Sequence, residues 1–424
     1  MLQNINSIIW AIVTSLIILM GFYFSKKLSF PQFNVKKIIK SLKVNNKDGI
    51  SPIKTLYLTL AGRIGVGSIA GVALAIYIGG PGTIFWMWVT SLISGSLAYT
   101  ETLLGIKYKN GSNYGGPSYY IYKGLNNKLL ASIYSLIVII AYLTGFIPIQ
   151  SNTIVKSSNM FLDINHGLIG LLLGLVTFLI VSGGINKIAN VTNRLVPFMT
   201  IIYIMMSLFA ILSNLDKFID IIILIIKSAF SFNSFFSGFM VTMLIGVQRG
   251  IFSNESGLGL GAIAASSSNS DNGCNSGYIQ VLGIYITTIL ICTATAFMIL
   301  TFDYGGLDIN SPNGIEITSL AFNYHFGGYS NILLVLCILL FSFTTILTGY
   351  YYCESSLKFL MGRIDLKWLR LVVPLSVFLG CVCSPKIIWS LVDIMVGILA
   401  IINIYALYKL RDKAFKYHKK CDRI

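Results

Sequence analysis

Two glycine-rich stretches interrupt long apolar segments of this chain near their middle. They are residues 62–71, Gly-Arg-Ile-Gly-Val-Gly-Ser-Ile-Ala-Gly, and residues 250–261, Gly-Ile-Phe-Ser-Asn-Glu-Ser-Gly-Leu-Gly-Leu-Gly. A helix that crosses a bilayer satisfies its own backbone, so glycine and polar residues at mid-depth expose carbonyl and amide groups instead. For either stretch alone, close packing of helices through glycine explains the pattern equally well. The pairing favours a solute-binding site built from two discontinuous helices, as in secondary transporters.

The composition places the chain in a membrane. Of its 424 residues, 55% are hydrophobic and only 11% are charged, and the mean hydropathy is +0.78. Such a composition excludes an ordinary soluble enzyme. Apolar runs of about 20 residues, the length that crosses a hydrocarbon core, predict an all-α polytopic membrane protein with eleven transmembrane helices. The predicted spans are 8–24, 54–78, 83–106, 129–155, 166–183, 195–213, 235–267, 277–301, 330–357, 368–384 and 387–408.

The distribution of basic residues predicts the orientation. The formal net charge is +16, and 25 of the 31 Lys and Arg lie in alternate loops and in the C-terminal tail. By the positive-inside rule the N-terminus lies outside and the C-terminus in the cytoplasm. Because these residues are spread over separate short loops, they are topological signals and do not indicate a nucleic-acid partner. We expect a multi-pass protein of a prokaryotic plasma (inner) membrane, with the bilayer as its partner and the oligomeric state left open, a monomer being one option.

The predicted helices form two matching sets. Residues 1–51 hold an extra N-terminal helix and a basic loop, and the ten remaining helices divide into sets of five at 52–214 and 233–409. Each set opens with its broken helix, and because five is odd the second set enters from the opposite face, as an inverted repeat requires. Residues 215–232 form the connecting external loop and 410–424 a basic cytoplasmic tail. Both breaks should meet at one depth.

The first break offers backbone groups to an anion. Gly65 and Gly67 let the chain leave the helix, and Ser68 stands where it can cap the half-helix that continues outward. Free N–H groups at such an end suit a carboxylate. Gln150, two residues after Pro148 in a later span, is costly in lipid unless it faces a cavity or a partner.

The second break carries an ionisable group. Ser253, Asn254 and Glu255 precede its glycines, and an acid at mid-depth is a functional candidate. Glu255 either handles an ion or a proton, caps the second half-helix, or pairs with Arg63 or Arg249, the arginines that stand just before the two breaks.

Other polar residues in the spans have simpler readings. Thr344 and Thr345 are neighbouring hydroxyls that can bind a small cation or join helices by hydrogen bonds. The seven cysteines lie mostly inside spans with no metal-like spacing, which predicts buried, reduced thiols. No constellation of histidines or carboxylates suggests an enzyme, so we expect no catalytic residues and no organic cofactor.

These stretches resemble the alanine or glycine:cation symporter family, part of the amino acid–polyamine–organocation superfamily. The likeness runs along nearly the whole chain. The blocks that carry it are residues 62–73, 79–89, 115–117, 196–199, 249–259, 292–296 and 351–354.

The resemblance implies a leucine-transporter-like fold and uptake of a small neutral amino acid driven by sodium as the coupling ion. It places the substrate carboxylate at Gly65, Val66, Gly67 and Ser68, with Phe252, Ser253 and Asn254 opposite and Gln150 and Gly349 nearby. It places sodium between the carbonyls of Ala61 and Ile64 and the hydroxyls of Thr344 and Thr345. Arg63, Arg249 and Glu255 take a charge or gating role.

Three positions depart from the family pattern. The family has Gly-Thr-Gly-Asn where this chain has residues 65–68, Ser-Ala-Pro where it has 260–262, and tryptophan where it has Gly349. If that indole limits the pocket, this protein accepts a bulkier amino acid than alanine. Proton coupling through Glu255 is a second variant, and an ion channel a third, although no ring of filter loops supports it.

Overall fold

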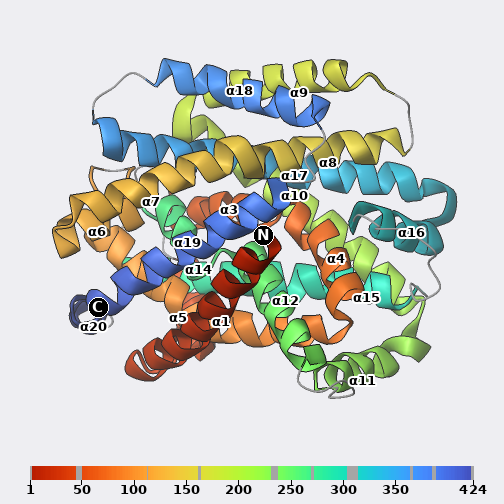
Figure 1. Cartoon of the computed structure of the whole chain (residues 1–424), viewed down its shortest axis with the longest axis horizontal. Helices are drawn as coiled ribbons and strands as arrows, with labels where there is room; N and C mark the ends of the chain where they lie inside the picture. The colour runs from red at the N-terminus through yellow and green to blue at the C-terminus, as the bar shows by residue number, and fades with distance from the viewer. Residues whose placement is uncertain are drawn as a thin grey trace.

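The computed structural model describes residues 2–43, 50–111, 113–160, 164–230, 237–268, 272–302, 314–362, 366–383 and 388–421. The regular structure in these ranges is helical, and the helices pack side by side into one bundle (Figure 1). The helices are α1 Leu2–Lys27, α2 Val35–Leu42, α3 Pro52–Arg63, α4 Ala70–Gly79, α5 Gly82–Lys107, α6 Pro117–Leu125, α7 Lys128–Ala141, α8 Ile147–Asn159, α9 His166–Val181, α10 Gly184–Leu212, α11 Phe218–Ala229, α12 Ser237–Asn254, α13 Leu260–Ala265, α14 Gly273–Ile284, α15 Thr293–Leu300, α16 Gly314–Phe326, α17 Ser330–Met361, α18 Lys367–Val382, α19 Ile388–Lys409 and α20 Arg411–Cys421.

Every predicted span falls on a described helix or on a pair of helices in sequence. By length and hydropathy, six described segments suffice on their own to cross a membrane, while Ala70–Gly79 and His166–Val181 are shorter apolar helices. The all-helical membrane class is therefore confirmed, and the number of eleven crossings stays a prediction. The predicted boundary between residues 232 and 233 lies outside the described residues.

Both predicted breaks are present, and they are built differently. Between α3 and α4 the chain passes through the short 3₁₀ turn Val66–Ser68, and the positive backbone φ angles of the described chain all lie elsewhere. Between α12 and α13 three residues have positive φ: Glu255 (55°), Gly257 (83°) and Gly259 (82°). The second break thus uses the left-handed conformation, which its two glycines adopt without strain and which Glu255 adopts as well.

Two helices next to the breaks contain a wide turn. A π-helical segment, Tyr142–Phe146, joins α7 to α8, and another, Tyr285–Cys292, joins α14 to α15. Such segments are rare and are frequent at functional sites. The sequence carries no signal for them.

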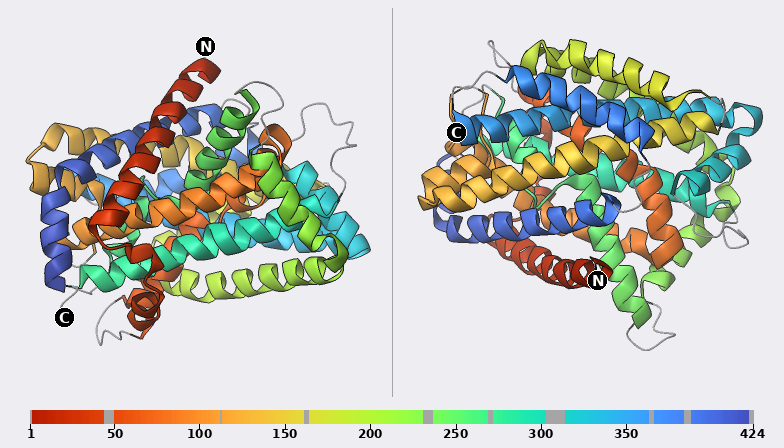
Figure 2. Two further views of the ribbon diagram at one scale, coloured as in Figure 1. Left: turned by 90° about the horizontal axis from the view of Figure 1, so that it is seen from below. Right: turned by 45° about the horizontal axis from the view of Figure 1, so that its top comes forward.

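Several short helices lie outside the predicted spans. The loop expected at residues 215–232 contains α11, and α2, α6, α16 and α20 are further additions. In Figure 1, α6 and α20 lie at one end of the bundle and α11 and α16 at the other. Figure 2 shows α1 on the outside of the bundle, where it packs against α5 and α19.

The expectation of reduced thiols is wrong for one pair. Cys274, at the start of α14, and Cys421, at the end of α20, form a disulfide across 147 positions of sequence. The cause is that α20 folds back onto α14, where the Gly273 N–H donates to the Tyr417 hydroxyl (3.4 Å). The other cysteines are free, and all but the exposed Cys383 are buried: Cys292, Cys337, Cys353, Cys381 and Cys383.

Candidate functional site

The two breaks meet in the middle of the bundle. The hydroxyl oxygens of Ser68 and Ser253 lie 3.1 Å apart, and both serines are fully buried. The Ser253 hydroxyl also lies 3.1 Å from the Cys292 sulfur, at the end of the second π-helical segment. The two breaks, 185 residues apart in sequence, are therefore in direct contact.

Side chains of neighbouring helices form hydrogen bonds with the polar backbone groups of the first break. The Val66 N–H donates to the Gln150 side-chain oxygen at 3.1 Å, and the Thr295 hydroxyl donates to the Ser68 carbonyl at 2.8 Å. Gln150 comes from α8, directly after the first π-helical segment. Its amide therefore faces the break, which is the arrangement that makes an amide tolerable at mid-depth.

An aromatic wall covers the second break. The rings of Phe146 and Phe252 stack with centroids 5.2 Å apart, and Phe252 lies 5.7 Å from Trp389. A Cβ at Gly67 would come within 2.9 Å of the Phe252 ring, so the first break needs glycine there to approach the second. The wall therefore joins the two breaks.

Asn254 supports the backbone of its own break. Its side-chain oxygen accepts hydrogen bonds from the Ser256 N–H (3.0 Å) and the Ser256 hydroxyl (2.6 Å). Its side-chain nitrogen is buried and has no hydrogen-bond partner among the described residues. Asn254 therefore holds one buried donor that the described residues leave unpaired.

Glu255 is held by two tyrosines. The hydroxyls of Tyr142 and Tyr352 each donate to one of its carboxylate oxygens at 3.0 Å. Within the described chain it makes no ion pair with Arg63 or Arg249, and its side chain does not cap α13. The expected cap of α13 and the expected pairing with Arg249 are thus wrong, because α7 and α17 supply the donors instead. The charges of Glu255 and Arg63 still attract each other without direct contact.

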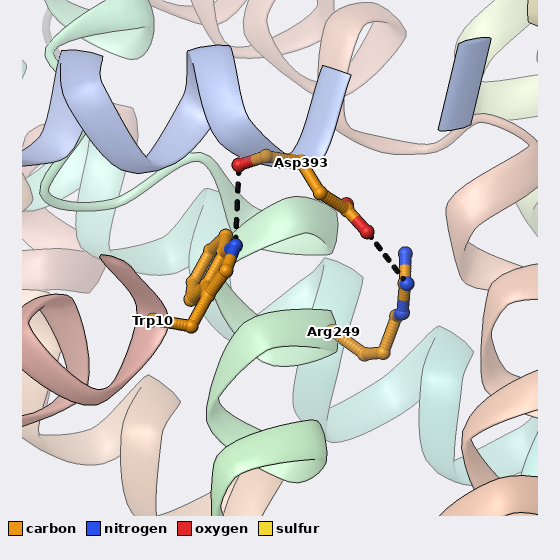
Figure 3. A network of polar contacts seen from close by, with 3 residues as sticks. All are labelled: Trp10, Arg249 and Asp393. Carbon is orange, nitrogen blue, oxygen red and sulfur yellow. Dashed lines mark hydrogen bonds and ion pairs between the residues drawn. The ribbon is translucent and has the colours of Figure 1, made fainter. Parts of the chain in front are cut away.

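Arg249 has a different carboxylate partner. It lies 3.1 Å from Asp393 of α19, and the Trp10 indole N–H of α1 donates to the Asp393 backbone carbonyl at 3.1 Å (Figure 3). Its guanidinium also lies 5.7 Å from the centre of the Phe252 ring and 5.8 Å from that of Trp389. The pair therefore lies directly against the aromatic wall.

Local sequence signals mark only one of these residues. An acid a few residues inside a predicted span was the available signal for Asp393. Nothing local marks Trp10, because 383 positions separate it from its acceptor.

Arg63 is the more buried of the two arginines, with 2% of its surface exposed. One guanidinium nitrogen donates to the Gln280 carbonyl at 3.2 Å, while Nε and the other terminal nitrogen have no hydrogen-bond partner among the described residues. Glycines make room for it, since a Cβ at Gly261 or Gly283 would lie 2.5 or 2.6 Å from its nitrogens. Its position is fixed by packing against α13 and α14.

The predicted sodium ligands come together only in part. The Thr345 hydroxyl donates to the Ala61 carbonyl at 2.9 Å, which joins α17 to the end of α3. The Thr344 hydroxyl instead donates within its own helix, to Leu340 and Phe341 carbonyls, and the Ile64 N–H donates back to Leu60. In the described chain, no group of three or more His, Cys, Asp or Glu is placed to hold a metal.

Gly349 lies beside the first π-helical segment. A Cβ there would come within 2.7 Å of the Tyr142 ring. The ring of Tyr142, whose hydroxyl also donates to Glu255, therefore occupies the space beside Gly349.

Comparison with known proteins adds independent findings. A family model for the sodium:alanine symporter family matches residues 1–423. The chain is 33% identical over 430 residues to the amino-acid carrier protein AlsT of Bacillus subtilis, covering 99% of this chain and 91% of AlsT. It is also 33% identical over 422 residues to the probable sodium/glutamine symporter GlnT of the same organism, covering 97% of this chain and 88% of GlnT.

The fold is similar to that of a solved structure. The crystal structure of MhsT in complex with L-phenylalanine matches with a TM-score of 0.54 at 12% identity, covering 86% of this chain and all of MhsT. At that identity the likeness concerns the arrangement of helices alone.

Proposed function

The chain belongs to the sodium:alanine symporter family, and we propose that it imports a small neutral amino acid, alanine or glycine, together with sodium. It is a membrane transporter of the amino acid symport class and not an enzyme. The observation that carries the proposal is the meeting of the two breaks at Ser68 and Ser253, with Gln150 on the backbone of the first.

We assign substrate binding to the groups that surround this meeting point. The carboxylate would accept hydrogen bonds from the backbone N–H groups of Val66 and Gly67 and from the Ser68 hydroxyl. The Val66 N–H now donates to the Gln150 oxygen, and the Ser68 N–H donates to the Gly65 carbonyl. The free side-chain donor of Asn254 and the ring of Phe252 would bind the rest of the molecule. Gly349 would act indirectly, through the position of Tyr142.

Sodium is treated as a co-transported substrate. The Ala61 carbonyl and the Thr345 hydroxyl are hard oxygen ligands of the kind that such a cation prefers, and they already lie next to Gly65 of the first break. Ile64 and Thr344 complete the proposed set after a change in local geometry. A membrane potential of about 100 mV supplies roughly 2.3 kcal/mol per sodium, and a tenfold gradient about 1.4 kcal/mol more.

We propose alternating access between two inverted halves, residues 52–214 and 233–409, with eleven crossings in all. Residues 1–51 add one helix, 215–232 connect the halves, and 410–424 form the tail. The N-terminus would lie outside and the C-terminus in the cytoplasm of a prokaryotic inner membrane, as the basic residues suggest. In this orientation the Arg249–Asp393 pair and the aromatic wall close the outer path.

A second candidate substrate is a larger amino acid such as glutamine. It is favoured by the three departures from the family pattern, including Val66 and Gly349, and by the similarity to GlnT, a probable sodium/glutamine symporter. Because Tyr142 fills the room beside Gly349, a larger substrate would require that ring to move.

Uptake by purified protein in proteoliposomes tests the proposal. Radiolabelled alanine, glycine and glutamine would be offered under a sodium gradient, a proton gradient and no gradient. We expect sodium-dependent accumulation, with Thr345→Ala raising the sodium concentration for half-maximal uptake and the matched variant Thr344→Ala changing it less. Equal uptake with and without a sodium gradient would contradict sodium coupling, and uptake driven by protons alone would point to Glu255.

A further inference from the structure

The chain makes a fixed bend after its first helix. Beyond Lys27 it turns through Ser29 and Phe30, both with positive φ (57° and 53°), into a 3₁₀ turn, Pro31–Phe33, and then into α2. Left-handed backbone at residues other than glycine persists only where surrounding contacts hold it. We call residues 29–43 the elbow.

Hydrogen bonds fix the elbow to the bundle. The Gln32 side chain donates to the Ser25 hydroxyl at 2.7 Å, and the Tyr285 hydroxyl donates to the Gln32 backbone carbonyl at 2.7 Å. Asn34 caps α2 by accepting from the Lys37 N–H at 3.2 Å. The elbow is therefore a built part of the protein, next to the second π-helical segment.

An open surface depression of about 430 Å³ lies in the elbow, and exposed apolar side chains surround it. Phe30, Phe33 and Val35 line it and are 45%, 55% and 60% exposed, and Ile39 of the next turn of α2 is 53% exposed. A short helix with an apolar face and a basic face is the form that lies in a membrane interface. The remaining lining residues are Ser29, Asn34 and Lys36.

The charge of this region has one sign. Lys36, Lys40 and Lys43 are exposed on the elbow, and Lys26 and Lys27 are exposed at the end of α1. The first 47 residues of the sequence contain no Asp or Glu. Lysines alone would suit any phosphate, but exposed phenylalanines beside them suit a phosphate that carries acyl chains.

We propose that the elbow binds an anionic phospholipid, with its phosphate at Lys36 and Lys40 and an acyl chain along Phe30, Phe33 and Val35. By the proposed topology this lipid belongs to the cytoplasmic leaflet. Because the elbow packs on α5 and α14, a bound lipid stabilises the arrangement of these helices.

Lipid binding by the purified full-length protein in neutral detergent tests the proposal without requiring transport. Phosphatidylglycerol, phosphatidylcholine and inorganic phosphate would be added separately, and binding of a fluorescent phosphatidylglycerol and the melting temperature would be measured. We expect phosphatidylglycerol to bind and to raise the melting temperature by several degrees, and the other two to do neither.

Matched variants locate the effect. Lys36→Gln/Lys40→Gln should weaken phosphatidylglycerol binding at least tenfold, while Lys419→Gln/Lys420→Gln, which makes the same charge change on exposed residues of α20, should leave it unchanged. Equal loss in both double variants, or no loss in either, would overturn the proposed site. If inorganic phosphate has the same effect as phosphatidylglycerol, the site does not select a lipid. If phosphatidylcholine has the same effect, the site does not depend on the negative charge of the lipid.

Discussion

The two arginines next to the breaks occupy comparable places in sequence but are held in different ways. Arg249 meets a carboxylate on another helix, Asp393, and both side chains keep some contact with solvent, at 12% and 6% exposure. Arg63 meets a backbone carbonyl, that of Gln280, and is enclosed where Gly261 and Gly283 leave room for it. An ion pair between helices can open and reform, whereas an enclosed guanidinium cannot leave without disturbing its neighbours. We therefore expect the Arg249–Asp393 ion pair to break and reform during transport, and Arg63 to keep its place against α13 and α14.

The largest expected effect is the loss of stability when Arg63 is replaced. Arg63→Ala should cost about 3–5 kcal/mol, because it leaves the Gln280 carbonyl and the nearby charge of Glu255 without their buried cation. The melting temperature of the purified protein measures this loss. Arg249→Ala is the matched control and should cost less, since its site is closer to solvent. Equal losses for the two variants would remove the distinction between them.

The next largest expected effect is the loss of transport when the Arg249–Asp393 ion pair is removed. Arg249→Ala and Asp393→Ala should each slow initial uptake at least about tenfold, which corresponds to 1.4 kcal/mol or more, while the double variant should be little worse than either. Such non-additivity is expected of two residues in direct contact. Initial uptake rates in proteoliposomes would be measured for the unaltered protein, the two single variants and the double variant, which together form a double-mutant cycle. Independent, additive losses would show that the pair does not act as a unit.

The second break contains a charged side chain, Glu255, and the first break does not. A third substitution removes that charge. Glu255→Gln keeps the shape but removes the charge that two tyrosine hydroxyls stabilise, at an expected cost of about 1.5–3 kcal/mol for charged hydrogen bonds. Tyr352→Phe removes one of the two donors and should cause a smaller loss. If Glu255 serves only to hold the second break, sodium-driven uptake by the Gln variant should fall in parallel with its stability. Selective loss of the uptake that a proton gradient drives would instead show that Glu255 binds the transported proton.

The breaks were predictable because their signal is local. Glycine and polar residues in the middle of an apolar run conflict with an uninterrupted membrane helix, whatever the rest of the chain does. Gln150 was predictable for the same reason, and the structure places it on Val66. Thr344 and Thr345 show the limit of such reasoning, because neighbours on an α-helix point about 100° apart at 3.6 residues per turn. Only Thr345 faces Ala61.

Partners across long stretches of sequence could not be predicted. Arg249 finds Asp393 across 144 positions, and Cys274 finds Cys421 across 147. These pairings depend on which helices pack together, which composition and hydropathy do not specify. The 12-residue helix α11 was interpreted as a loop because it is too short for a span of about 20 residues.

The smallest expected effect concerns the support of the Arg249 side by the extra N-terminal helix. The indole of Trp10 donates to the Asp393 backbone carbonyl (Figure 3), so Trp10→Phe keeps most of the packing and removes one hydrogen bond. We expect a loss of about 0.5–1.5 kcal/mol and a several-fold slower uptake, less than for either member of the ion pair. Trp86→Phe is the matched control, because its indole also donates to a backbone carbonyl, that of Ala229, away from the breaks. If Trp10→Phe slows uptake no more than Trp86→Phe does, α1 packs against the bundle without taking part in the opening of the Arg249 side.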